Sequence, residues 1–164
     1  MNISTIAHLI QDSAEQLSIS PDIVTSFILV ESNGNPWAVR YERNYEWICE
    51  VSTMATLLET TYDTALMMQR SSYGLTQIMG AVAWQMGHRG WSTELLNPET
   101  NLTYFVKYLS KLIKKQSLTD PLDMYAAWNS GSVKKIDGKY ANYRQVANFR
   151  RIYEEVTRGA IKWK

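Results

Sequence analysis

The chain has 164 residues, of which 45% are hydrophobic and 20% are charged, and its formal net charge is +1. This composition excludes a disordered chain, and the nearly neutral charge argues against a nucleic-acid binder that depends on bulk charge. Cys49 is the single cysteine and the two histidines lie far apart in the sequence, so neither an internal disulfide nor a metal cluster is expected. We therefore expect one domain over residues 1–164, with a core of its own and no cofactor.

The sequence contains neither a targeting signal nor a membrane-spanning segment. Residues 1–5 lack the basic start and the apolar core of a signal peptide. No run approaches the roughly 20 apolar residues that a transmembrane helix needs. We expect a protein made in a cytoplasm without an export signal of its own, and neither a membrane nor a nucleic acid as a partner.

Helical spacing of apolar residues predicts an all-α or mainly α fold. The first predicted helix covers residues 3–18. The second follows the N-cap residue Ser20 and the helix-starting residue Pro21, and it stops at residues 33–36. Further helices are predicted over residues 51–70, 75–86, 98–115, 121–128 and 143–158. Since no strand-like alternation of useful length occurs, we expect roughly seven helices.

Glu31 is placed in the last turn of the second predicted helix, behind an apolar run. The negative end of the helix dipole and the apolar neighbours both disfavour a charged carboxylate there, so the pKa of Glu31 should rise. A carboxyl group with a raised pKa can act as a general acid near neutral pH. From this stretch alone, a solvated glutamate at a helix end is the commoner interpretation.

Residues 33–50 form a predicted loop that is rich in aromatic and acidic side chains. This density next to the end of a helix is typical of a cleft wall, although a loop pinned by its aromatic residues fits the composition equally well. The loop supplies three further carboxylates, Glu42, Glu46 and Glu50. Glu42 is the best candidate for a second acidic group in a site, because Arg40 would keep it ionised while Glu31 stays protonated.

Four ordered motifs carry a resemblance to a known family. They are Glu31-Ser32 and residues 74–79, 97–102 and 126–131. Together they resemble the soluble lytic transglycosylase family, which shares a lysozyme-like α fold with goose-type lysozyme, and the likeness extends over roughly residues 20–155. Two segments, residues 36–47 and 72–80, look most like the single-domain bacteriophage and prophage branch.

The resemblance implies an enzyme that cleaves peptidoglycan glycan strands between N-acetylmuramic acid and N-acetylglucosamine. Glu31 matches the catalytic residue of the family, which acts first as an acid and then as a base and leaves a 1,6-anhydro product. Six further residues are expected to bind the substrate in the cleft: Ser32, Gln77, Met79, Trp128, Asn129 and Tyr143. A polar helix-face role for Gln77, core packing for Met79 and a structural role for Asn129 remain as alternatives. Asn97 and Asn101 are expected to be structural.

Two of the departures from the family pattern bear on the chemistry. Trp128 stands where the family usually has tyrosine; it keeps a stacking face and an N–H donor but cannot accept a hydrogen bond. The segment between Glu31 and Gly74 is longer than in the minimal family and contains Glu42. If Glu42 faced Glu31 across a water molecule, the enzyme would be a hydrolytic muramidase that inverts the sugar.

The phage-like segments suggest a biological setting. We expect a role in phage cell-wall penetration or lysis, with peptidoglycan glycan strands as substrate and phage tail or baseplate proteins as further partners. The protein would be carried in the virion, or made in the host cytoplasm and act on the periplasmic wall. A weakly active structural module of a tail hub is a second alternative.

Overall fold

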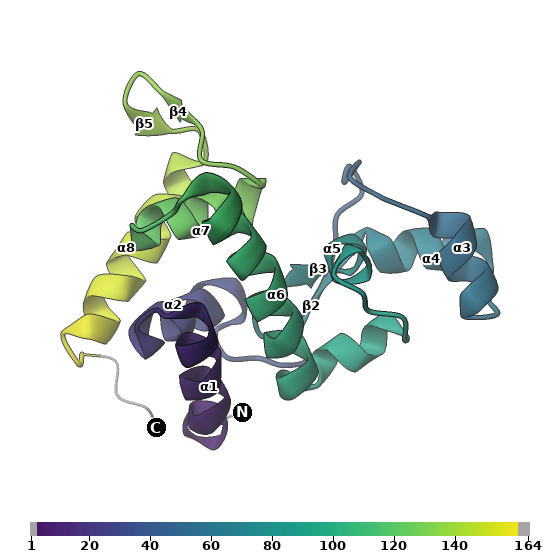
Figure 1. The fold of residues 1–164 in the computed structure, drawn as a ribbon, viewed down its shortest axis with the longest axis horizontal. Coiled ribbons are helices and arrows are strands. Elements are labelled where there is room, and N and C mark those ends of the chain that lie inside the picture. The colour runs from purple at the N-terminus through teal and green to yellow at the C-terminus, as the bar shows by residue number, and fades with distance from the viewer. Residues whose placement is uncertain (1–2, 161–164) are drawn as a thin grey trace.

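The computed structural model describes residues 3–160, and it is mainly α-helical, as the sequence predicts (Figure 1). The α-helices are α1 Ala7–Leu17, α2 Pro21–Ser32, α3 Val51–Leu57, α4 Tyr62–Gln69, α5 Gly80–Gln85, α6 Pro98–Gln116, α7 Pro121–Ser130 and α8 Tyr143–Thr157. Two 3-10 helices, η1 Ile3–Ile6 and η2 Ser92–Leu96, precede α1 and α6. Within residues 3–160, no helix is both long and apolar enough to cross a membrane.

Short strands complete the fold. Strands β1 Val39–Tyr41, β2 Ser71–Tyr73 and β3 Ile78–Met79 form an antiparallel sheet in the order β1-β2-β3. Strands β4 Lys135–Ile136 and β5 Lys139–Tyr140 form a separate hairpin before α8. These strands do not alter the predicted mainly α class, and strands of two or three residues are too short to show a period-two pattern in the sequence.

Two predicted helices have different boundaries in the structure. The helix predicted over residues 51–70 is divided into α3 and α4, with Thr61 as the N-cap residue of α4. The helix predicted over residues 75–86 is wrong for its first five residues, since α5 begins only at Gly80. Gly74 and Gln77 have positive φ angles of 68° and 51°, so the chain turns there before β3. A short buried strand and a buried helix cannot be separated by apolar periodicity alone.

The largest hydrophobic core surrounds helix α2. The Phe27 ring is fully buried and lies against four aromatic rings, with centroid distances of 5.1 to 6.0 Å. These rings belong to Phe105 of α6, Tyr125 and Trp128 of α7, and Phe149 of α8. Helix α2 also packs against α1 and α8 (Figure 1). Because α2 is apolar around most of its circumference, it can occupy the centre of a helical assembly.

Buried and capping asparagines fix the turn between β2 and β3 against α6. The Asn101 side chain is fully buried, and its amide nitrogen donates to the carbonyls of Tyr73 and Leu95, both at 2.9 Å. Its oxygen accepts from the backbone and hydroxyl of Thr76 at 3.0 and 2.8 Å. Asn97 caps α6 through hydrogen bonds to the first helical N–H groups. The structural roles predicted for Asn97 and Asn101 are confirmed.

A second, smaller core holds the α3–α4 region. Its buried members are Val51, Met54, Ala55, Ala65, Met68 and Trp84. The buried Gln69 side chain binds both backbone groups of Cys49, accepting from its N–H at 2.9 Å and donating to its carbonyl at 2.5 Å. The segment before α3 is thereby anchored to this second core.

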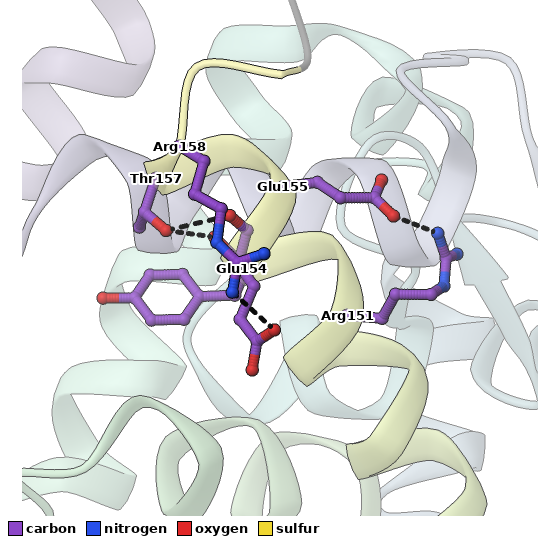
Figure 2. Close-up of polar contacts among 6 residues, drawn as sticks. Arg151, Glu154, Glu155, Thr157 and Arg158 are labelled. Carbon is purple, nitrogen blue, oxygen red and sulfur yellow. Dashed lines mark hydrogen bonds and ion pairs between the residues drawn. The ribbon is translucent and has the colours of Figure 1, made fainter.

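Helix α8 ends in solvent-exposed ion pairs (Figure 2). Arg151 pairs with Glu155 at 2.8 Å, and Arg158 pairs with Glu154 at 3.4 Å, each one helical turn apart. The Thr157 hydroxyl donates to the Glu154 carbonyl at 3.1 Å. Exposed pairs of this kind contribute about 0.3–0.5 kcal/mol each. They support the last turns of α8 and play no part in the site described below.

Candidate active site

A cleft of about 1010 Å³ lies where α2 ends. Its walls come from the end of α2, the segment between β1 and α3, β3 with α5, the second half of α6, and the end of α7. Glu31 lies on this cleft, together with Arg40, Glu42, Gln77, Met79, Trp128 and Asn129. Motifs that are far apart in the sequence therefore meet in one cavity of a size suited to a ligand.

Local sequence explains why Glu31 reaches the cleft. The Ser20 hydroxyl accepts the Asp22 N–H at 3.2 Å and caps the start of α2. At the other end Asn33 takes a left-handed conformation with φ 52°, and the helix stops at Ser32. Glu31 thus lies in the last turn, where α2 leaves the core and meets the cleft.

Burial controls the ionisation of Glu31. The residue keeps some exposure on its cleft side, but the carboxyl oxygen Oε1 is buried and has no hydrogen-bond partner in the described part of the chain. Burial raises the pKa of Glu31 to about 7, while a hydrogen bond with Tyr125 and the charge of Arg40 act in the opposite direction. The geometry therefore does not fit a solvated helix-end glutamate. Near neutral pH this group is poised between its protonated and ionised forms.

Tyr125 was not predicted as a site residue. Its side chain is 3% exposed, and its ring stacks on Phe149 at a centroid distance of 4.5 Å and an interplanar angle of 9°. Burial and the neighbouring Glu31 raise the pKa of the Tyr125 hydroxyl, so it stays protonated and can donate to the ionised carboxylate. Tyr125 lies three residues before Trp128, one turn earlier on α7. That spacing is the sequence signal that would have revealed it.

Trp128 lies between the core and the cleft. Its ring contacts Phe105 at a centroid distance of 5.0 Å and Tyr108 at 5.6 Å, and it also lines the cleft. Tyr108, on α6, lines the cleft as well and was not predicted, because its spacing on an amphipathic helix resembles that of a core residue. The family position usually occupied by tyrosine is therefore a packed aromatic wall in this chain, and Tyr125, one turn earlier, carries the hydroxyl that is bonded to Glu31.

The Gln77 side chain lines the cleft but is largely occupied by the protein. Its amide nitrogen donates to the carbonyls of Ala38 and Gly74 at 3.0 and 2.9 Å, and its oxygen accepts from the Ser72 hydroxyl at 2.9 Å. Both amide hydrogens are engaged, so only the oxygen retains a free lone pair for a ligand. Gln77 is in a turn, so the helix-face alternative was wrong.

The other predicted substrate-binding residues divide into two groups. Met79 of β3 and Asn129 at the end of α7 line the cleft. Ser32 and Tyr143 are not among the lining residues that the structure describes. The Ser32 hydroxyl donates to the Leu75 carbonyl at 2.8 Å, which ties the end of α2 to the turn after β2. Tyr143 is 54% exposed at the start of α8.

Of the loop carboxylates Glu42, Glu46 and Glu50, Glu42 alone lines the cleft within residues 3–160. The expected ion pair is present, with 2.5 Å between Arg40 Nε and Glu42 Oε1. Glu50 instead accepts from the Trp84 indole N–H at 3.1 Å, on the side of the second core. No group of three or more acidic, histidine or cysteine side chains in the described chain is arranged to hold a metal ion.

A mainly α fold with a cleft and a buried carboxyl group at a helix end fits the lysozyme-like class of protein. The family described as Transglycosylase SLT domain matches residues 8–149. The chain belongs to this family and is a lytic transglycosylase domain that acts on peptidoglycan. Searches of curated proteins and of solved structures gave no match.

Proposed function

We propose that Glu31 cleaves the β-1,4 bond between N-acetylmuramic acid and N-acetylglucosamine, first as general acid and then as general base. The observation that carries this proposal is its buried carboxyl group on the cleft, with a pKa raised to about 7. At that pKa about half of the molecules carry a protonated Glu31 near neutral pH, and the group ionises readily once its proton is transferred.

The proposed reaction uses one carboxyl group for two proton transfers. In the first step Glu31 protonates the glycosidic oxygen, the bond to the anomeric carbon breaks, and positive charge develops on the muramic acid ring. The acetamido group of the substrate stabilises that charge. In the second step the Glu31 carboxylate removes the proton from the muramyl 6-hydroxyl. The 6-oxygen of the sugar then bonds to the anomeric carbon of the same ring. The products are a free N-acetylglucosamine end and a 1,6-anhydro end, and no water is consumed.

Tyr125 has a defined part in this scheme. Its hydroxyl stabilises the ionised form of Glu31, which exists between the two steps. Tyr125→Phe keeps the ring but removes the hydroxyl, so the pKa of Glu31 should rise further and the high-pH limit of cleavage should move up by about one pH unit. A pH profile of the cleavage rate measures this shift. Tyr108→Phe is the matched control, and equal profiles for both variants and the parent protein would contradict the assignment.

Hydrolysis is the second candidate, and the position of Glu42 on the same cleft favours it. Arg40 balances the Glu42 charge, so Glu42 would serve as a base that activates water while Glu31 donates its proton. In this scheme the product has a reducing end. We consider transglycosylation the better supported of the two, because the chain belongs to a transglycosylase family.

Mass analysis of digested peptidoglycan separates the two reactions. Anhydro ends are lighter than reducing ends by one water molecule, and we expect the anhydro form. Glu42→Gln is expected to change the rate by less than about ten-fold and to leave the product unchanged. If reducing ends predominated and Glu42→Gln abolished them, the enzyme would be a hydrolytic muramidase using both carboxylates.

We further propose a role in phage cell-wall penetration or lysis, on the basis of the phage-like segments at residues 36–47 and 72–80. Tail or baseplate proteins would then be partners. Mass spectrometry of purified virions distinguishes a virion component from a protein that is made only for lysis. A tail-hub module with little activity would be found in virions but would release few fragments from peptidoglycan.

A further inference from the structure

The cleft carries two cationic side chains that have no partner among residues 3–160. Of its basic residues, Arg40 is neutralised by the ion pair with Glu42. Arg43 and Lys115 also line the cleft, and neither forms a hydrogen bond or an ion pair within the part of the chain that the structure describes. The remaining acidic lining residue, Glu31, is uncharged whenever it is ready to act as an acid. The functional state of the cleft is therefore positively charged.

The two cations come from different walls. Arg43 belongs to the segment between β1 and α3, and Lys115 belongs to the last turns of α6 (Figure 1). Both side chains are exposed to solvent, so neither has been desolvated for a structural purpose. A ligand lying along the cleft would meet two unneutralised positive charges. Charges placed in this way attract and orient anionic ligands and add little affinity for neutral ones.

We propose that Arg43 and Lys115 select glycan strands that carry carboxylates and discriminate against neutral β-1,4 glycans. The inference rests on the proposed function, because it names the substrate chemistry of the same cleft. Muramic acid bears a lactyl group at O3, which neutral chitin oligosaccharides lack. The lactyl group presents its own carboxylate when the peptide stem is absent. When the stem is present, the stem supplies the carboxylates. Arginine and lysine recognise carboxylates from either source through charge-assisted hydrogen bonds.

The test measures binding separately from cleavage. All proteins in this test carry Glu31→Gln, and the protein with that single substitution is the parent for the comparison. Glutamine is an uncharged side chain of similar size and leaves bound glycan uncut. The cationic pair is removed by Arg43→Gln with Lys115→Gln. The control, Lys114→Gln with Arg150→Gln, removes the same charge from exposed residues that do not line the cleft. Each protein is cosedimented with intact peptidoglycan, with glycan stripped of its stems by an amidase, and with chitin.

We expect the cleft variant to bind anionic glycan about ten-fold more weakly than the parent and to bind chitin equally. The parent should also lose affinity for anionic glycan as salt rises, more steeply than the cleft variant. A loss confined to intact peptidoglycan assigns the contact to stem carboxylates, and a loss confined to stripped glycan assigns it to the lactyl carboxylate. Equal losses on chitin, or an equal loss in the control variant, would overturn the proposal.

This test does not depend on the outcome for the proposed reaction. If the unaltered protein released no fragments from peptidoglycan, the proposed function would fail. The binding difference between anionic and neutral glycan would still decide the role of Arg43 and Lys115.

Discussion

Glu31→Gln is expected to reduce the rate of peptidoglycan cleavage by at least about a thousand-fold, because both proton transfers of the proposed reaction pass through this carboxyl group. Glutamine has a similar shape but can neither donate an acidic proton nor accept one from the muramyl hydroxyl. The rate is measured as the fall in turbidity of a peptidoglycan suspension, with mass analysis of the released fragments.

The matched control is Glu46→Gln, because Glu46 is an exposed residue of the same loop region that does not line the cleft within the described chain. It should retain nearly full activity. Far-ultraviolet circular dichroism should show the same helical content in both variants. A Glu31→Gln protein that kept more than about a tenth of the rate would show that another group supplies the proton.

The same substitution is expected to stabilise the protein above neutral pH. The pKa of Glu31 is about 7 in the folded protein and 4.5 as its ordinary value, so the folded state binds the proton more tightly than the unfolded state. The favourable contribution is complete below about pH 4.5 and is lost as pH rises through about 7. Glu31→Gln has no proton to lose. Its free energy of unfolding should therefore exceed that of the unaltered protein by up to about 3 kcal/mol at higher pH.

Urea unfolding at several pH values from acid to mildly alkaline measures this difference. All other titrating groups are common to the two proteins, so subtracting their unfolding free energies isolates Glu31. The difference should be small in acid and should grow as the carboxyl group ionises. Glu46→Gln should show no such growth. A difference that did not change with pH would mean that the Glu31 carboxyl group is not held in a desolvated site.

The apolar pattern of the sequence was sufficient to predict the long helices. Helices α2 and α6 carry clear capping signals at Ser20 and Asn97, and their predicted limits agree with the structure to within a residue or two. The turn and strand at residues 74–79 were missed for a physical reason. Their conformation depends on Asn101, a buried side chain more than twenty residues away that holds Tyr73 and Thr76 through three hydrogen bonds. Local patterns do not report such a distant constraint.

The candidate site, too, could be predicted from the sequence only in part. Glu31 was predicted from its helix end, and the family motifs supplied the expectations for Gln77 and Trp128, all of which lie on the cleft. Tyr125 was missed because a tyrosine in an apolar stripe has the pattern of a core residue, and its ring is indeed in the core. Only its hydroxyl reaches the site. A sequence pattern describes a residue as a whole, whereas this site depends on individual atoms.

Glu31 and the cleft segment between β1 and α3 are supported by different hydrophobic clusters. Glu31 extends from α2, whose buried residues lie in the large cluster around Phe27, whereas the segment before α3 is fastened to the small cluster through Gln69. Changes in that segment can therefore accumulate without disturbing the residues that support the acid. The substrate preference of the cleft can therefore change while the surroundings of Glu31 stay constant.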